Sequence, residues 1–148
     1  MRAVIQRVKS AHVDVDSKTV GKIGHGILVY CGFESGDSQA EAEYIARKIL
    51  NIRIFPDDNG KMNLSLLDYD RGEILSISQF TLASHIKKGR RPDFNNALDP
   101  VSALPLYDFF NNILEEKIKV EKGVFGTMME VYSVNDGPVT FIIEKKFK

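Results

Sequence analysis

The sequence predicts an α+β fold, with a strongly curved, largely antiparallel and barrel-like β-sheet and two main helices. Apolar and polar residues alternate over 3–8 and 11–15 with the two-residue period of strands, and two later segments have helical periodicity. These strands and helices do not alternate strictly, which disfavours a doubly wound parallel sheet. The chain has 148 residues and no Pro/Gly/Ser-rich linker or repeat, so we expect one domain over 1–148.

The N-terminal part of the chain is predicted to form strands. After the alternating segments, Asp16-Ser17-Lys18 indicates a turn, and 19–23 indicates a return strand. Gly24-His25-Gly26 ends that strand. The apolar run over 27–33 predicts a central strand that is covered on both faces.

The first helix has a clear start signal, because Ser38 followed three residues later by Glu41 forms a capping box. The apolar residues that follow recur at helical spacing, at Ala42, Ile45, Ala46, Ile49 and Leu50. Residues 51–55 predict a short strand, and the turn-forming residues over 56–60 end it.

The second half is predicted to contain a strand over 73–80, an irregular loop over 83–98, a helix and three closing strands. Asp99 and Pro100 have the character of an N-cap and a first helical residue. Pro105 interrupts the helical pattern, so we expect the helix to start later or to kink there. The closing strands are expected over 117–120, 127–134 and 139–143.

Composition excludes several classes of protein. Twenty Lys and Arg balance twenty Asp and Glu, so binding of long nucleic acid through bulk charge is disfavoured, whereas a local basic patch is allowed. Cys31 is the only cysteine, which rules out an intramolecular disulfide, and its apolar strand predicts an inert thiol. The three histidines are scattered, so no metal site is expected. With no signal peptide or membrane-spanning segment in the sequence, we expect a soluble cytoplasmic protein.

Polar side chains gather at the end of a predicted strand, in Ser78-Gln79-Phe80-Thr81-Leu82. A strand end beside a loop is a common place for a site, since the scaffold is rigid and the edge is open. Ser or Thr acts as a nucleophile only with a base nearby, and the sequence offers none here. Ordinary turn hydrogen bonds are the alternative explanation. The basic stretch over 87–91 suits either a solvated loop or a contact with phosphates.

A third motif, Asn135-Asp136-Gly137-Pro138-Val139-Thr140, lies between two predicted strands, where a hairpin turn is the simplest interpretation. Pro138 lacks the N–H that the start of a strand would use. A Gly-Pro peptide bond is also among the bonds that can adopt the cis form. A cis bond would hold two carbonyl oxygens side by side, an arrangement that suits an ammonium group.

Together the motifs resemble a single family, because they occur in one order along essentially the whole chain. The sequence is similar to D-aminoacyl-tRNA deacylases, the family first called D-tyrosyl-tRNA deacylase. Ala83-Ser84-His85-Ile86 and Pro105 depart from the family pattern, beside the motifs and not within them. The resemblance rests on the 78–82 and 135–140 motifs and on Ile5-Gln6-Arg7-Val8, Arg53-Ile54-Phe55, Gly60-Lys61-Met62-Asn63 and Lys88-Gly89-Arg90-Arg91-Pro92.

The resemblance implies a cytosolic homodimer that needs no metal or cofactor. It would hydrolyse the ester that joins a D-amino acid, or glycine on a wrong tRNA, to the 3′-terminal adenosine. The pocket for the adenosine and the ester would be lined by Ser78, Gln79, Phe80 and Thr81. Gly137 and Pro138, joined by a cis bond, would enter the partner's active site and reject L-amino acids, and Arg7 would brace them.

Two further expectations concern tRNA binding and the chemistry. Basic residues of one short loop are expected to bind the tRNA: Lys87, Lys88, Arg90 and Arg91. The resemblance implies that the substrate's own 2′-OH takes part in the chemistry, with Thr81 as a nucleophile as the alternative account. A second function, a non-catalytic nucleic-acid- or nucleotide-binding module on the same fold, stays open.

Overall fold

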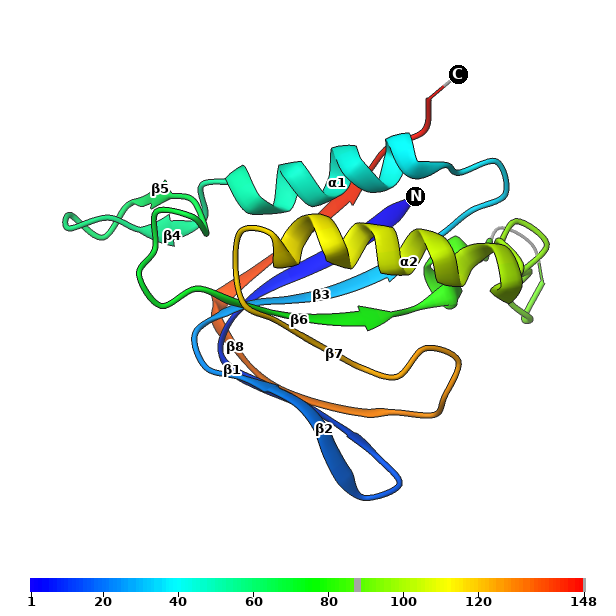
Figure 1. The fold of residues 1–148 in the computed structure, drawn as a ribbon, viewed down its shortest axis with the longest axis horizontal. Helices are drawn as coiled ribbons and strands as arrows, with labels where there is room; N and C mark the ends of the chain where they lie inside the picture. The colour runs from blue at the N-terminus through cyan, green and yellow to red at the C-terminus, as the bar shows by residue number, and fades with distance from the viewer. Residues whose placement is uncertain (87–88, 148) are drawn as a thin grey trace.

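A mixed six-stranded sheet forms the body of the computed structural model, which describes residues 1–86 and 89–147. The sheet is strongly curved, and two helices lie side by side across one of its faces (Figure 1). The predicted α+β architecture with a barrel-like sheet and two main helices is therefore confirmed. The helices are α1 (Gln39–Asn51) and α2 (Pro100–Glu115), and the strands of the sheet are β1 (Arg2–Val15), β2 (Lys18–Ile23), β3 (Gly26–Gly32), β6 (Glu73–Ser78), β7 (Val120–Lys122) and β8 (Glu130–Glu144).

Strand β1 organises the sheet because it pairs antiparallel with three strands. Its first half pairs with β3, from Arg2 opposite Gly32 to Val8 opposite Gly26. Its second half pairs with β2, and β8 runs along its other edge. The predicted turn between β1 and β2 is present, with Asp16 and Ser17 at φ of 49° and 62°, as tight hairpins require.

The other two pairings, β3 with β6 and β6 with β7, are parallel. Parallel neighbours need a long crossover connection, and here α1 and α2 lie within those connections. The sheet is thus mixed in detail, with the antiparallel pairings gathered around β1.

Helix α1 begins as predicted. The Ser38 hydroxyl accepts a hydrogen bond from the Ala40 N–H at 3.2 Å, and the Glu41 carboxylate accepts one from the Ser38 N–H at 2.9 Å. The strand predicted over 51–55 is wrong. Asn51 still belongs to the helix, where its side-chain amide donates to the Arg47 carbonyl, and only Phe55 enters the two-residue strand β4 (Phe55–Pro56), which pairs with β5 (Met62–Leu64).

Helix α2 starts at Pro100, after an Asp99 N-cap that accepts from the Ser102 N–H at 3.0 Å. The expectation of a later start is therefore wrong, since the helix runs through Pro105. Pro105 removes the hydrogen bond to the carbonyl of Val101, one turn earlier. Val101 is highly exposed, so water can satisfy that carbonyl.

Three predicted strand boundaries are corrected. Strand β6 ends at Ser78, and a 3₁₀ turn, η1 (Phe80–Ala83), follows it. The strand expected over 117–120 begins later, as β7 (Val120–Lys122). The strands expected over 127–134 and 139–143 are parts of β8 and are not joined by a hairpin, because both segments pair with β1. Between the pairs Gln6–Thr140 and Val8–Asn135, residues 136–139 form a bulge that faces Arg7.

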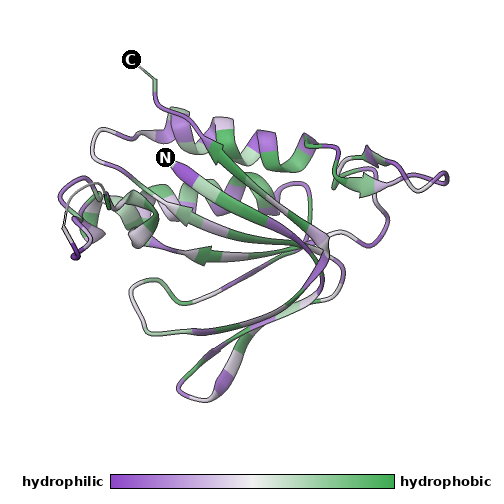
Figure 2. Cartoon of the chain, turned by 180° about the vertical axis from the view of Figure 1, so that it is seen from behind, coloured by the Kyte–Doolittle hydropathy of each residue, from purple (hydrophilic) through white to green (hydrophobic). Residues whose placement is uncertain are grey.

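Two apolar cores hold these layers together. The larger core lies between the helices and the sheet and contains Ile5, Ile45, Ile74 and Phe110. The smaller core, with Val13, Leu28 and Leu75 among its members, fills the opposite, concave face. Hydrophilic and hydrophobic segments alternate along the helices, as expected of amphipathic elements (Figure 2). None of the helices in the described part of the chain is long and apolar enough to span a bilayer.

The buried Glu41 carboxylate gives a test of this architecture. Burial raises its pKa, but hydrogen bonds from the Ser38 side chain and from the backbone N–H groups of Phe147 and Ser38 outweigh burial and lower the pKa to about 2. The folded pKa lies below the unfolded one, so the stabilisation is complete above the unfolded pKa and is lost as pH falls towards 2. We expect Glu41→Gln to lose about 1–2 kcal/mol of unfolding free energy at pH 7.

Urea unfolding at pH 7 and pH 3 measures this effect. The difference between the variant and the wild type should shrink at the lower pH. Glu43→Gln, on the exposed face of the same helix, is the matched control and should change the unfolding free energy little at either pH. Equal losses in the two variants would contradict the role of the Glu41 carboxylate.

Candidate active site

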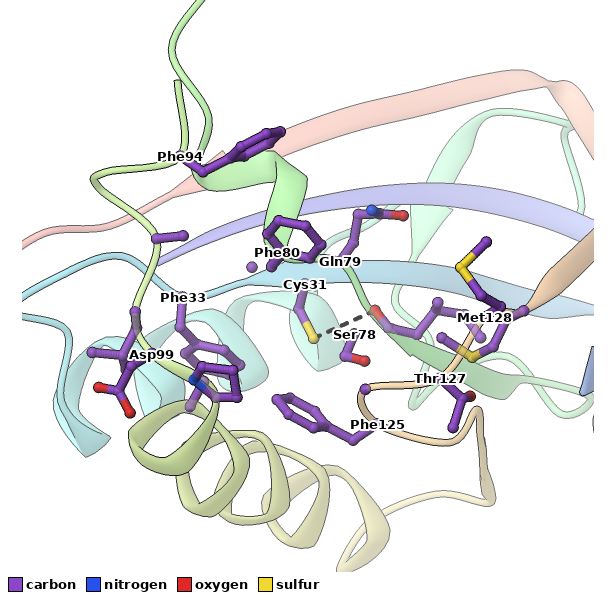
Figure 3. A pocket seen from close by; sticks show the side chains of 18 of the residues that line it. Cys31, Phe33, Ser78, Gln79, Phe80, Phe94, Asp99, Phe125, Thr127 and Met128 are labelled. Carbon is purple, nitrogen blue, oxygen red and sulfur yellow. Dashed lines mark hydrogen bonds between the residues drawn. The ribbon is translucent and has the colours of Figure 1, made fainter. Parts of the chain in front are cut away.

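A cavity of about 670 Å³ opens where the parallel strands β3 and β6 end. Cys31 of β3 lies opposite Ser78 of β6 in the register, so both strands deliver residues to the same edge of the sheet. The start of α2 and the segment before β8 form the remaining walls (Figure 3). Most of the lining is apolar, including Phe33, Ile77, Phe80, Phe94, Phe125, Met128 and Met129.

The predicted catalytic segment lies at this cavity. Ser78, Gln79 and Phe80 line it, whereas Thr81 is not among the lining residues. The Gln79 N–H donates to the Cys31 carbonyl at 2.7 Å and so holds the segment to β3. The Gln79 side-chain amide donates to the Thr81 hydroxyl at 2.6 Å. The N–H groups of Phe80 and Thr81 open the 3₁₀ turn and lack partners within it.

Several lining residues were not predicted from the sequence. Phe94 packs against Phe80, with ring centroids 5.3 Å apart, and Phe125 packs against Tyr107. The strand expected over 127–134 begins only at Glu130, so Phe125, Met128 and Met129 come from the irregular segment before β8. Its only local signal is apolar residues next to Gly123 and Gly126, which is too common a pattern to indicate a site.

Among the described residues, no strong base lines the cavity. Its lining, as far as the structure describes it, includes no histidine. Its carboxylate, that of Asp99, accepts hydrogen bonds from Ser102, and these lower its pKa. Cys31 is buried as predicted, and burial raises the pKa of its thiol to about 12, so it stays protonated. Within residues 1–86 and 89–147, no three His, Cys, Asp or Glu side chains gather in a way that could hold a metal ion.

Arg7, Gly137 and Pro138 form a second group. The Gly137-Pro138 peptide bond is cis, as expected. The Arg7 guanidinium donates through Nη1 to the Ile54 carbonyl at 2.6 Å and lies 3.2 Å, Nε to Oδ2, from the carboxylate of Asp136. The Nε–H does not point at that oxygen, so the second contact is an ion pair without a hydrogen bond. Arg7 thus ties the bulge of β8 to the segment before β4.

This second group lies away from the cavity of its own chain, and none of its members lines that cavity. Cys31, at the cavity, pairs with Ala3 of β1, whereas Arg7 pairs with Ile27. The four residue steps from Ala3 to Arg7 correspond to about 13 Å along the strand. The sequence-predicted residues therefore form two separate clusters.

The described part of the basic stretch lies close in sequence to Phe94, which lines the cavity. Arg90 and Arg91 are exposed, and Lys87 and Lys88 lie outside the described residues. Two backbone hydrogen bonds between His85 and Asp93, of 2.8 and 3.0 Å, close the loop that carries the arginines. Phe94 follows directly, so the loop begins and ends next to the wall of the cavity.

Comparisons with known proteins agree with this geometry. A family model described as D-Tyr-tRNA(Tyr) deacylase matches residues 4–144. The chain is 55% identical over 145 residues to the D-aminoacyl-tRNA deacylase of Geotalea daltonii, covering 97% of this chain and 96% of that one. It is 52% identical over 147 residues to the enzyme of the same name from Bacillus velezensis, covering 99% of both chains. The chain therefore belongs to the D-Tyr-tRNA(Tyr) deacylase family.

Solved structures have the same fold. A structure named c-Myc DNA Unwinding Element Binding Protein superposes with a TM-score of 0.93 at 40% identity and covers 99% of this chain and 100% of that chain. A probable eukaryotic D-amino acid tRNA deacylase superposes with a TM-score of 0.83 at 21% identity, covering 96% and 97% of the two chains. At that identity the second similarity concerns the fold alone.

Proposed function

We propose that the protein hydrolyses the ester between a D-amino acid and the 3′-terminal adenosine of tRNA, and also the glycyl ester on a wrong tRNA. The observation that carries this proposal is the cavity at the ends of β3 and β6, where Ser78, Gln79 and Phe80 meet an aromatic, largely apolar lining. Such a lining suits a nucleobase, and the polar strand end suits the ribose and the ester. Because its substrate is charged tRNA, the protein would act in the cytoplasm.

The chemistry asks little of side chains. An aminoacyl ester is activated by its neighbouring ammonium group, so orientation and stabilisation of the oxyanion can suffice. Water adds to the ester carbonyl carbon, and the N–H groups of Phe80 and Thr81 stabilise the oxyanion that forms. The tetrahedral intermediate then collapses, the bond to the ribose 3′-oxygen breaks, and that oxygen leaves with a proton. The adjacent 2′-OH is the group placed to assist, because the described lining of the cavity offers no strong base.

We further propose that Gly137 and Pro138 serve the active site of a partner copy in a homodimer. The separation between this pair and the cavity of the same chain supports the idea. Strand β8, which carries the pair, also exposes large apolar side chains that a second copy would cover: Tyr132, Val134, Phe141 and Ile142. The backbone carbonyls of the pair would hold the substrate ammonium and leave no space for an L side chain, while Arg7 holds the bulge in place.

Release of amino acid from tRNA tests the activity directly. D-Tyrosyl-tRNA and L-tyrosyl-tRNA, labelled on the amino acid, are incubated with the protein, and free tyrosine is counted. We expect rapid release from the D substrate and release at the spontaneous rate from the L substrate. Equal rates for both, or no rate above the spontaneous one for the D substrate, would contradict the proposal.

A second candidate is a nucleic-acid-binding module without catalysis. It is favoured by one observation, that the 40% identical structure is named as a binding protein of a DNA element. The same release assay separates the two functions, because a binding module protects the ester or leaves its hydrolysis unchanged. The intact segment from Ser78 to Thr81 at the cavity favours the enzyme.

Thr81→Ala should weaken hydrolysis without abolishing it. The variant loses the hydrogen bond from Gln79, so we expect roughly a 2- to 10-fold fall in kcat. A substrate with hydrogen in place of the terminal 2′-OH should lose more, about 100-fold. Single-turnover kinetics measure both effects, and Thr81→Ser, which keeps the hydroxyl, should stay close to wild type. A trapped covalent bond between the amino acid and Thr81 would refute this mechanism.

Gly137→Ala should reduce the preference for D over L substrates roughly tenfold or more, because a small displacement in a binding site costs that much. Gly137 has a φ of 127°, and a Cβ there would lie 2.7 Å from Cγ2 of Val139 and 3.3 Å from Nη2 of Arg7. The ratio of D to L release rates measures the effect. Gly60→Ala is the matched control, since Gly60 also has a positive φ but has open space around it. An unchanged ratio in Gly137→Ala would count against a role of this glycine in rejecting L substrates.

Replacing Arg90 and Arg91 by Gln should raise KM and leave kcat nearly unchanged. Counterion release makes binding to phosphates salt-dependent, so the slope of log KM against log salt should fall by about 0.7 for each phosphate that the variant no longer neutralises. Steady-state kinetics between low and moderate salt measure this slope. Lys18→Gln, at the β1–β2 turn, is the control, because it also removes one positive charge at a single site and should leave the slope unchanged. A large fall in kcat with unchanged KM would instead assign an arginine to the chemical step.

A further inference from the structure

The side chains of Phe80 and Phe94 form an exposed aromatic pair at the mouth of the cavity, and the chemistry described above uses only the backbone N–H of Phe80. Phe80 is 60% exposed and Phe94 is 41% exposed, although both are large apolar side chains. Their ring centroids lie 5.3 Å apart and the ring planes are tilted by 53°. In Figure 3, Phe94 lies beyond Phe80 on the side away from Phe125. Both rings line the cavity, and the pair presents aromatic surface to solvent at its mouth.

The backbone holds Phe94 in this position. The loop before it is closed by the two hydrogen bonds between His85 and Asp93. After it, the Ala97 N–H donates to the Phe94 carbonyl at 2.9 Å, and the Leu98 N–H donates to the Phe33 carbonyl at 3.0 Å. Because both flanks are fixed, the ring is a preorganised surface, which lowers the entropic cost of binding a flat partner.

The charges beside the pair select the kind of partner. Arg90 and Arg91 precede Phe94 by four and three residues and are exposed. Neither of them forms an ion pair with any residue in the described part of the chain. An exposed aromatic surface next to unpaired cations is the usual composition of a binding site for single-stranded nucleic acid. A second protein copy would not need the two cations.

We propose that Phe94, supported by Phe80, stacks against the base of the penultimate nucleotide of the tRNA. This inference rests on the proposed function, since the terminal adenosine must occupy the cavity for the next base to reach the rim. Phe94 lies at the mouth of the cavity and the arginines precede it by only four and three residues, which suits a penultimate base at Phe94 and phosphates at the arginines. Stacking of this kind tolerates any base, because every base has a π-face.

Binding of short nucleotides tests the stacking without depending on catalysis. The probes are the dinucleotide cytidylyl-adenosine and an analogue that keeps its sugar and phosphate but lacks the cytosine base. We expect the wild type to bind the dinucleotide roughly 5- to 10-fold more tightly, the low end of base–aromatic stacking. The ring protons of Phe94 should also shift upfield in NMR spectra only when the cytosine is present.

Variants identify the residue responsible. Phe94→Leu keeps an apolar side chain and removes the π-face, so the affinity ratio between the two probes should fall to about one, while Phe94→Tyr should keep it. Val101→Ala, which shortens another exposed apolar side chain near the start of α2, is the control and should leave the ratio unchanged. A wild-type ratio near one, or a ratio that survives Phe94→Leu, would overturn the proposal.

The same probes separate this inference from the proposed function. D-Tyrosyl esters of the dinucleotide and of its base-free analogue are compared for release of tyrosine. If neither ester is hydrolysed but the dinucleotide still binds more tightly, the activity is wrong and the stacking site stands. If both are hydrolysed with equal KM, the activity stands and the stacking site is wrong.

Discussion

The hydrogen bonding of strand β1 along both of its edges is the constraint on which both residue clusters depend. One edge pairs with β3 and then with β2, and the other edge pairs with β8. Backbone groups in a sheet interior must be paired, so this arrangement leaves β1 little freedom to shift its register. The register in turn decides where the cavity at the end of β3 and the bulge of β8 lie relative to each other.

The cavity itself follows from the two parallel pairings. Strands β3 and β6 run in the same direction because α1 lies in the connection between them, so Cys31 and Ser78 end at one edge. The chain there leaves β6 and turns into η1, which aims Phe80 at the cavity mouth and brings Gln79 against Thr81. The packing of the helices on the sheet therefore positions the polar segment from Ser78 to Thr81 at the cavity, and no buried charged side chain of the described residues is needed to hold it there.

The bulge of β8 is held in place by side chains and not by strand pairing. Four residues of β8 face the single residue Arg7, and that side chain contacts both the bulge and the carbonyl of Ile54. An interruption of the ladder in the middle of a long strand would normally cost pairing energy. Here the Asn135 side chain accepts a hydrogen bond from the Val139 N–H, so the bulge retains an internal hydrogen bond. Its exposed position on the outer strand leaves it accessible to another molecule.

The sequence by itself determined the elements whose signals are local: the Ser38 capping box, the Asp99 N-cap, the turn at Asp16 and the polar strand end at Ser78. Tertiary structure alone decided that 127–134 and 139–143 form one strand, because pairing with β1 overrides the turn signal of Gly137-Pro138. It also decided that Phe94 and Phe125 reach the cavity, since irregular segments carry no periodicity and their positions depend on long-range contacts.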